Sequence, residues 1–174
     1  MCPVLDWSHA VDEIGESGLH LERSATASER ESVAEALQII ACEAITARYD
    51  IKALAGGRYR LRGTVEAALA QSCVITLDVL ETRLDEAFDV EFRPADELSV
   101  SAEATVSLEN PDLETLEHNR IPVGRIVYEH LAAALDPYPK KEGAAFAWED
   151  ESGGPDAASS QSPFSVLSKL KHEP

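Results

Sequence analysis

Few residues in this chain combine a reactive side chain with the neighbours that its chemistry requires. Cys73 follows Ser72 in an apolar, alternating run, and no histidine that could activate the thiol lies close to it in sequence. A buried, unreactive cysteine is the favoured interpretation, because reactive thiols occupy electropositive and partly exposed sites. A hydrolase that uses Cys73 is kept as an alternative, and it predicts that this thiol is alkylated rapidly in the folded protein.

Other motifs of enzyme and metal sites are incomplete or absent. Glu129 and His130 are adjacent, but the His-Glu-x-x-His spacing of zinc enzymes does not occur. Gly56 and Gly57 are placed in a predicted hairpin and do not open a helix, so they form no phosphate-binding loop. A Gly-x-Ser-x-Gly elbow is also missing. We therefore expect no catalytic residue, no metal, no cofactor and no enzymatic activity.

The concentrated positive charge of the chain lies in two neighbouring predicted strands. Its members surround Asp50 on one face and are Arg48, Lys52, Arg58, Arg60 and Arg62. Two interpretations stay open. The arginines protect a solvated sheet face from aggregation, or they form a contact surface for phosphate or for an acidic partner. The second makes these five residues a candidate RNA-binding or partner-binding site.

The middle of the sequence is strongly acidic. Between Asp78 and Glu117, thirteen acidic residues stand against two arginines, without the Asp-x-Asp-x-Asp-Gly order of a calcium loop. Within this stretch Asp85, Asp89 and Glu91 share one face of a predicted strand. They serve solubility or form a face for a basic partner. We hold the second as a hypothesis, with acidic and basic charge expected on both faces of one sheet.

An antiparallel sheet is predicted from Tyr49 to Phe92, the longest tract of alternating side chains. The glycines at the turn allow two loop lengths. A two-residue loop mixes apolar and charged side chains on each face, whereas the three-residue loop Ala55-Gly56-Gly57 separates them. We predict the three-residue loop, with an apolar face formed by Ala47, Tyr49, Ile51, Ala53, Tyr59, Leu61 and Val65.

The remaining pattern predicts an α+β fold. A capping box of Ser28 with Glu31 and an apolar stripe predict a helix over 29–40. A second helix begins near Pro122 and is stopped by Pro137. Further strands are expected within 4–14, with Trp7 as a buried anchor, and over 18–23, 42–55, 58–69, 73–77, 82–92 and 104–108. We expect these strands to form a mostly antiparallel curved sheet or a partly open barrel, with two helices packed on it.

Composition and length indicate one domain with tails. The 174 residues carry a formal net charge of −17, which repels nucleic acid outside a local basic patch and attracts basic proteins. Three cysteines without a close pair suggest neither disulfides nor zinc. The sequence shows no signal peptide and no apolar run of the ~20 residues that a membrane span needs, so we expect a cytoplasmic protein without membrane contact.

The domain is predicted to span 1–139, followed by an acidic and polar flexible linker over 140–161. A short basic amphipathic motif is predicted over 162–174. Its apolar positions are Phe164, Leu167 and Leu170, and its cations include Lys169 and Lys171. This motif folds back on its own domain or docks on a partner, and both alternatives stay open.

Several of these pieces together resemble the YceD family of large ribosomal RNA subunit accumulation proteins. The strands from Arg58 to Phe92 around Cys73 resemble the family core, and residues 121–139 resemble its helix and proline exit. Residues 162–171 resemble its closing Pro-Phe-x-x-Leu-x-x-Leu-Lys signature. Trp7-Ser8-His9, with residues 18–31, resembles the alphaproteobacterial branch.

The resemblance implies a non-enzymatic bacterial role in 23S ribosomal RNA accumulation, with ribosomal RNA or a basic ribosomal or assembly protein as partner. In one respect the chain departs from the family. The central strands of relatives often carry Cys-x-x-Cys, but Thr76 takes the second position here, so a metal at this place is not expected. A small-molecule-binding protein with a barrel-like sheet is the alternative function. The oligomeric state stays open.

Overall fold

The computed structural model describes residues 4–95 and 111–145 of the chain. The chain comprises two units, residues 1–142 and 143–174, and the fold reported below is that of the first. Its main sheet has the strand order β2-β3-β4-β5-β6, and a separate pair is formed by β1 and β7. The main strands are β2 (Leu19–Ser24), β3 (Ala41–Leu54), β4 (Arg58–Ser72), β5 (Val79–Arg93) and β6 (Asp112–Thr115).

All neighbours in the main sheet are antiparallel except β5 and β6, which run parallel. The helices are α1 (Ala27–Leu37) and α3 (Val123–Ala134), with a 3-10 turn, η1 (Val11–Glu13). The prediction of an α+β fold with a mostly antiparallel sheet and two helices is confirmed. The sheet of the described residues stays open and does not close into a barrel.

The three-residue turn between β3 and β4 is confirmed. Leu54 pairs with Arg58, and Ile51 pairs with Leu61, so Ala55, Gly56 and Gly57 form the loop. The two glycines have φ angles of +80° and +71°, which residues with a β-carbon adopt only with strain. The predicted apolar set therefore shares one face of the sheet.

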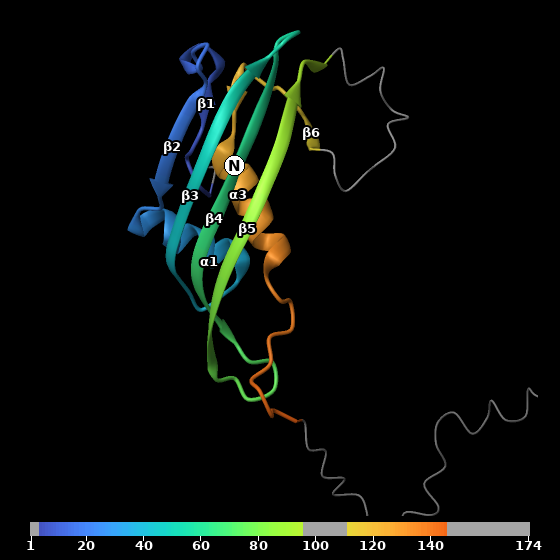
Figure 1. The fold of residues 1–174 in the computed structure, drawn as a ribbon. Helices are drawn as coiled ribbons and strands as arrows, with labels where there is room; N and C mark the ends of the chain where they lie inside the picture. Colours follow the sequence, from blue (N-terminus) through green and yellow to red (C-terminus); the bar gives the residue numbers. More distant parts are fainter. Residues whose placement is uncertain (1–3, 96–110, 146–174) are drawn as a thin grey trace, which may run out of the picture. The chain divides into compact units, whose positions relative to one another are not determined.

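Both helices pack on this apolar face. In Figure 1, α1 and α3 lie behind the sheet, with α1 against β3 and α3 against β4 and β5. The stripe predicted for the second helix is buried at Val123, Ile126, Val127 and Leu131. Trp7, only 1% exposed, is the buried anchor that the sequence predicts. The space in which the alternative hypothesis places a small ligand is thus filled by side chains of the core.

The capping box of α1 was predicted at the wrong residues. Thr26, not Ser28, is the N-cap: its hydroxyl accepts the N–H of Glu29 at 3.3 Å, and the Glu29 carboxylate accepts the N–H of Thr26 at 2.8 Å. The sequence holds two overlapping Ser/Thr-x-x-Glu patterns, 26–29 and 28–31, and both satisfy the local rule. The first is selected because the Glu29 carboxylate also accepts the indole N–H of Trp7 at 2.9 Å.

Three predicted strands need correction or fall outside the description. The strand over 73–77 is wrong, because β4 continues to Ser72 and the chain then turns, with Leu77 at a positive φ of 62°. The strand within 4–14 is reduced to β1 (His9–Ala10), which pairs with β7 (Arg120–Ile121). The strand predicted over 104–108 lies outside the described residues. Both β6 and β7 were missed, because segments of two to four residues carry too little alternation to be detected.

Gly63 provides the first test of the packing. A β-carbon at this position would lie 2.6 Å from Phe88 Cζ and 2.7 Å from Tyr49 Cβ, and it would also clash with the Arg48 carbonyl. We predict that Gly63→Ala lowers the free energy of unfolding by roughly 1–3 kcal/mol, as overpacking does. Urea denaturation measures this change. Gly15→Ala is the matched control, since nothing lies within 4 Å of a β-carbon there, and an equal loss in both variants would contradict the packing described.

Candidate interaction surface

The face of the main sheet turned away from the helices is the candidate site, called here the outer face. Directly paired residues share a face, and side chains alternate along each strand. The register therefore assigns a mainly polar set of side chains to this face. They are His20, Glu22, Ser24, Thr46, Arg48, Asp50, Lys52, Arg58, Arg60, Arg62, Thr64, Glu66, Ala68, Arg83, Asp85, Ala87, Asp89 and Glu91.

The acidic and basic candidate residues lie on the same face, which corrects an expectation. The hypothesis of separate surfaces for RNA and for a basic partner placed the two charges on both faces of the sheet. In the register observed, Arg60 stands directly opposite Glu91, and Arg62 opposite Asp89. The error arose because the pairing of β4 with β5 depends on the long turn after Ser72, which local alternation does not define.

Asp89 is the centre of this pairing. Its two oxygens accept bonds from Arg60 Nε and Nη2, both at 2.8 Å, and Oδ2 also accepts a bond from Arg62 Nε at 2.8 Å. Hydrogen bonding from Arg60 is the main cause that lowers the pKa of Asp89, although partial burial opposes it. The same hydrogen bond raises the pKa of Arg60. A bidentate arginine fixes the geometry of the carboxylate as well as its charge.

Glu91 is held in a similar way at the same end of the sheet. Its Oε1 accepts a bond from Arg93 Nε at 2.8 Å and another from Arg58 Nη1 at 3.4 Å. The glutamate is buried, at 8% exposure. Arg93 was missed in the sequence, although it continues the alternation of Asp89 and Glu91. Glu91 thus forms part of the framework of the outer face.

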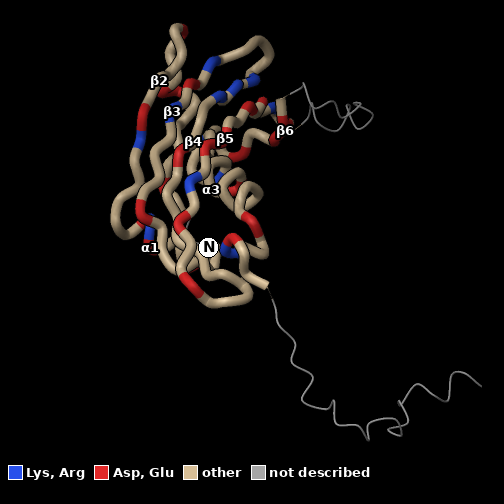
Figure 2. The backbone as a smooth tube through the Cα atoms, turned by 60° about the horizontal axis from the view of Figure 1, so that its bottom comes forward, with Lys and Arg blue, Asp and Glu red and all other residues tan. Residues whose placement is uncertain are grey.

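The remaining basic candidates are more open to solvent. Arg48 bridges Glu22 at 2.9 Å and Glu66 at 2.8 Å across three strands. The hydrogen bond that Arg48 donates to Glu22 is the main cause that raises the pKa of Arg48. Lys52 lies 3.9 Å from Asp50, and its side chain is 62% exposed. Figure 2 shows that lysine and arginine residues gather where β3 turns into β4.

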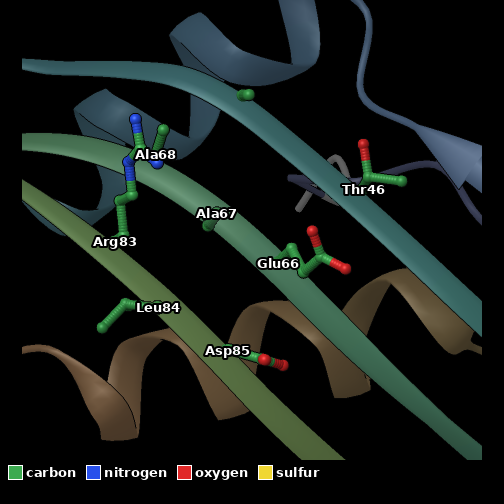
Figure 3. Close-up of a pocket in the computed structure, with 8 residues that line it drawn as sticks. Thr46, Glu66, Ala67, Ala68, Arg83, Leu84 and Asp85 are labelled. Atoms are coloured by element: carbon green, nitrogen blue, oxygen red, sulfur yellow. The ribbon is translucent and has the colours of Figure 1, made fainter.

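Charge is unevenly spread over the outer face. At the β3–β4 turn and the adjoining end of β5, five cations lie near three carboxylates. The cations are Lys52, Arg58, Arg60, Arg62 and Arg93, and the carboxylates are Asp50, Asp89 and Glu91. Further along the sheet Glu66 stands directly opposite Asp85, beside a shallow hollow lined by alanines (Figure 3). Like charges placed opposite each other across two strands destabilise a sheet.

The residues considered for catalysis do not form a site. Glu129 pairs with Arg125 at 3.1 Å, and the His130 ring packs 5.8 Å from Phe88. Cys73 is buried, and its sulfur accepts the N–H of Thr76 at 3.4 Å and the N–H of Lys141 at 3.3 Å. These bonds, with that of the Thr76 hydroxyl as the largest cause, lower the pKa of the thiol to about 6.

The described residues around Cys73 do not fit a metal. Residues 4–95 and 111–145 contain no group of three or more histidine, cysteine or acidic side chains able to hold a cation. Phe164, Leu167, Leu170, Lys169 and Lys171, proposed as a terminal motif, lie outside the described residues.

Replacing Asp89 tests the ion pairs of the outer face. Its pKa is lowered in the folded protein, so its contribution is present above the ordinary aspartate value and disappears as pH falls through the folded value. We predict that Asp89→Asn costs about 1 kcal/mol of unfolding free energy at pH 7, since the side chain is partly exposed. Urea denaturation over a series from pH 7 to about pH 2 should show that the difference begins to shrink near pH 4 and is lost only as pH falls through the lowered pKa of folded Asp89. Asp12→Asn, at an exposed position, is the control. It should change neither the unfolding free energy at pH 7 nor its dependence on pH.

Comparison with known proteins identifies the family of the chain. The model of the family described as "Large ribosomal RNA subunit accumulation protein YceD" matches residues 61–171. This match contains most of β4, all of β5 and α3, and the outer-face residues of β4 and β5 from Arg62 onward. No curated protein and no solved structure matches the chain. Within the described residues, neither helix has the length and apolar composition of a bilayer-spanning segment. The chain belongs to the YceD family, which is named for accumulation of the large ribosomal RNA subunit.

Proposed function

We propose that this protein supports accumulation of the large ribosomal subunit by binding its components, without catalysing a reaction. The observation that carries the proposal is the outer face, which neither helix covers and which is densely charged. A face that only contributed to stability would need fewer charges, since exposed ion pairs contribute little. Rigid strands hold these charges in fixed positions, which favours recognition of a partner.

The basic end of the outer face is proposed to contact ribosomal RNA. A surplus of cations at the β3–β4 turn creates a local positive region on a protein with a net charge of −17. Arg62 and Lys52 are the most exposed of the group, with side chains 54% and 62% accessible. Arg58 and Arg60 already bind carboxylates and would orient the others. Because few phosphates can be contacted, we expect weak binding that is steeply reduced by salt.

The acidic part of the same face is proposed to meet a basic ribosomal or assembly protein. Asp85 is the most suitable member of the candidate set, because among the described residues it has no ion pair and stands opposite Glu66. Asp89 and Glu91 are held by arginines, so they support the surface more than they bind. A lysine or arginine from a partner would relieve the repulsion between Asp85 and Glu66.

The finer assignments rest on the sequence. We place the protein in the cytoplasm of an alphaproteobacterium, supported by Trp7-Ser8-His9 and by residues 18–31. The division into a domain over 1–139, a linker over 140–161 and a terminal motif over 162–174 is also a proposal, as is binding of a partner by that motif. Absence of catalysis is supported by the burial of Cys73, at 0% exposure, and by the pairing of Glu129 with Arg125.

Charge reversal at the basic end tests the proposed RNA contact. We predict that Lys52→Glu with Arg62→Glu strongly reduces co-sedimentation of the full chain with precursor large subunits at low salt. Lys52 makes only a 3.9 Å pair with Asp50, whereas Arg62 also donates to Asp89 at 2.8 Å, so the variant removes that bond and keeps the bidentate bonds from Arg60. Sucrose-gradient fractions probed for the protein and for ribosomal RNA give the measurement.

Arg83→Glu is the matched control, because it reverses one charge on the same face near Asp85, away from the β3–β4 turn. It should leave sedimentation unchanged. The thermal transition shows whether the double variant is folded. If it is folded and still sediments with precursor large subunits like the original protein, the basic end plays no part in binding. If the control loses sedimentation to the same extent, general charge and not the basic end is responsible.

A further inference from the structure

Four large apolar side chains project into solvent at one end of the sheet, far along the strands from the β3–β4 turn. They are Val74, Leu77, Val79 and Tyr138, and we name them the apolar platform. Their exposed fractions are 46%, 76%, 60% and 71%. Val74 and Leu77 belong to the turn between β4 and β5, Val79 is the first residue of β5, and Tyr138 belongs to the segment after α3. Figure 1 shows these two segments side by side.

Hydrogen bonds brace the platform. Within the turn, the Cys73 N–H donates to the Asp78 carbonyl at 2.8 Å, and the Leu77 N–H donates to the Cys73 carbonyl at 2.9 Å. The Val74 N–H donates to the Pro139 carbonyl at 2.9 Å. Lys141 adds a salt bridge from Nζ to Asp78 at 2.8 Å. These bonds therefore connect the turn to the segment after α3 and hold the apolar side chains of the platform in fixed positions.

The backbone of Leu77 is a further unusual feature. Its φ of 62° lies in the left-handed region, which residues other than glycine, asparagine and aspartate rarely adopt. Asparagine or glycine at position 77 would relieve this strain and remove an apolar side chain from water. The chain has leucine there, which lowers stability through the strained backbone and through the apolar side chain left in water. Strained positions and exposed apolar side chains both concentrate at sites of function.

A hollow adjoins the platform on the side of the helices. Leu37, Ile39, Val74, Leu135, Pro137 and Pro139 supply its apolar lining. An aliphatic side chain of a partner that lies along Leu77 and Tyr138 could enter this hollow. Burial of a few such anchors contributes most of the binding energy in many protein interfaces.

The charge around the platform indicates the kind of partner. Asp136 lines the hollow, Asp78 lies in the turn, and Glu81 shares a face of β5 with Val79. Lys141 is already paired with Asp78. A second copy would bring the same acidic border and another net charge of −17, so electrostatic repulsion disfavours a dimer here. Phosphate is disfavoured for the same reason.

We propose that the apolar platform is a docking site for a protein segment in which aliphatic side chains are flanked by lysine or arginine. The aliphatic side chains pack on Leu77 and in the hollow, and the flanking cations meet Asp136 and Glu81. This site lies at the end of the sheet opposite the β3–β4 turn, away from the proposed RNA contact, and the proposed function enters only in the choice of proteins to be tested.

Photo-crosslinking of the full chain tests this proposal. A photoreactive phenylalanine derivative is placed at Tyr138, and the protein is mixed with the purified proteins of the large ribosomal subunit, freed of RNA. We expect a crosslink that mass spectrometry maps to a segment with aliphatic residues beside lysine or arginine. Leu77→Asn in the same protein should lower the crosslinking yield on the order of tenfold, as loss of an interface anchor does.

Leu77→Asn separates binding from folding. Asparagine tolerates the left-handed backbone, so the thermal transition should stay the same or rise. Leu21→Asn is the matched control, an exposed leucine on β2 outside the platform, and Lys52→Glu with Arg62→Glu controls for the outer face. Both should keep the crosslink. The proposal is overturned by an unchanged yield in Leu77→Asn, by no crosslink, by a crosslink to a second copy, or by one to a segment without the stated composition.

Discussion

The register of the β3–β4 hairpin is the constraint on which the rest of the structure depends. A loop one residue shorter would move every side chain of β4 to the opposite face and place Arg60 and Arg62 in the core. The positive φ angles of Gly56 and Gly57 allow the three-residue turn. Burial of Leu61 and Val65 beneath the helices then favours the same register. Turn chemistry and hydrophobic burial thus select one arrangement, and the charged outer face is its direct consequence.

The elements predicted correctly are those in which many successive residues follow the same periodic pattern of apolar and polar side chains. Examples are the β3–β4 hairpin, the alternation of β5 and the apolar stripe of α3. Each depends on neighbours in sequence, so the sequence alone was sufficient to predict it. The cap of α1 was misplaced because two overlapping patterns satisfy the same rule, and only contact with Trp7 distinguishes them. The turn after Ser72 was taken for a strand, since Cys73, Ile75 and Leu77 alternate, although only Cys73 of the three is buried.

The candidate site was predicted in composition and not in arrangement. Parity along β4 and β5 placed Arg60, Arg62, Asp89 and Glu91 away from the core. Parity cannot tell which residues of two strands face each other, since that depends on the length and path of the turn between them. As a result, charges assigned to two partners turned out to bind one another. The exposed part of the face is therefore smaller than its charged composition suggests.

The short pair of β1 with β7 has a consequence for synthesis of the chain. His9 pairs with Ile121, and the Trp7 carbonyl accepts the N–H of Gly124, so residues near the start of the domain depend on partners more than 100 positions later. Contacts so distant in sequence make folding slow compared with helical proteins of this size. During translation α1 can cover its part of β3 early, whereas the part of β4 and β5 that α3 covers stays open until that helix has been synthesised.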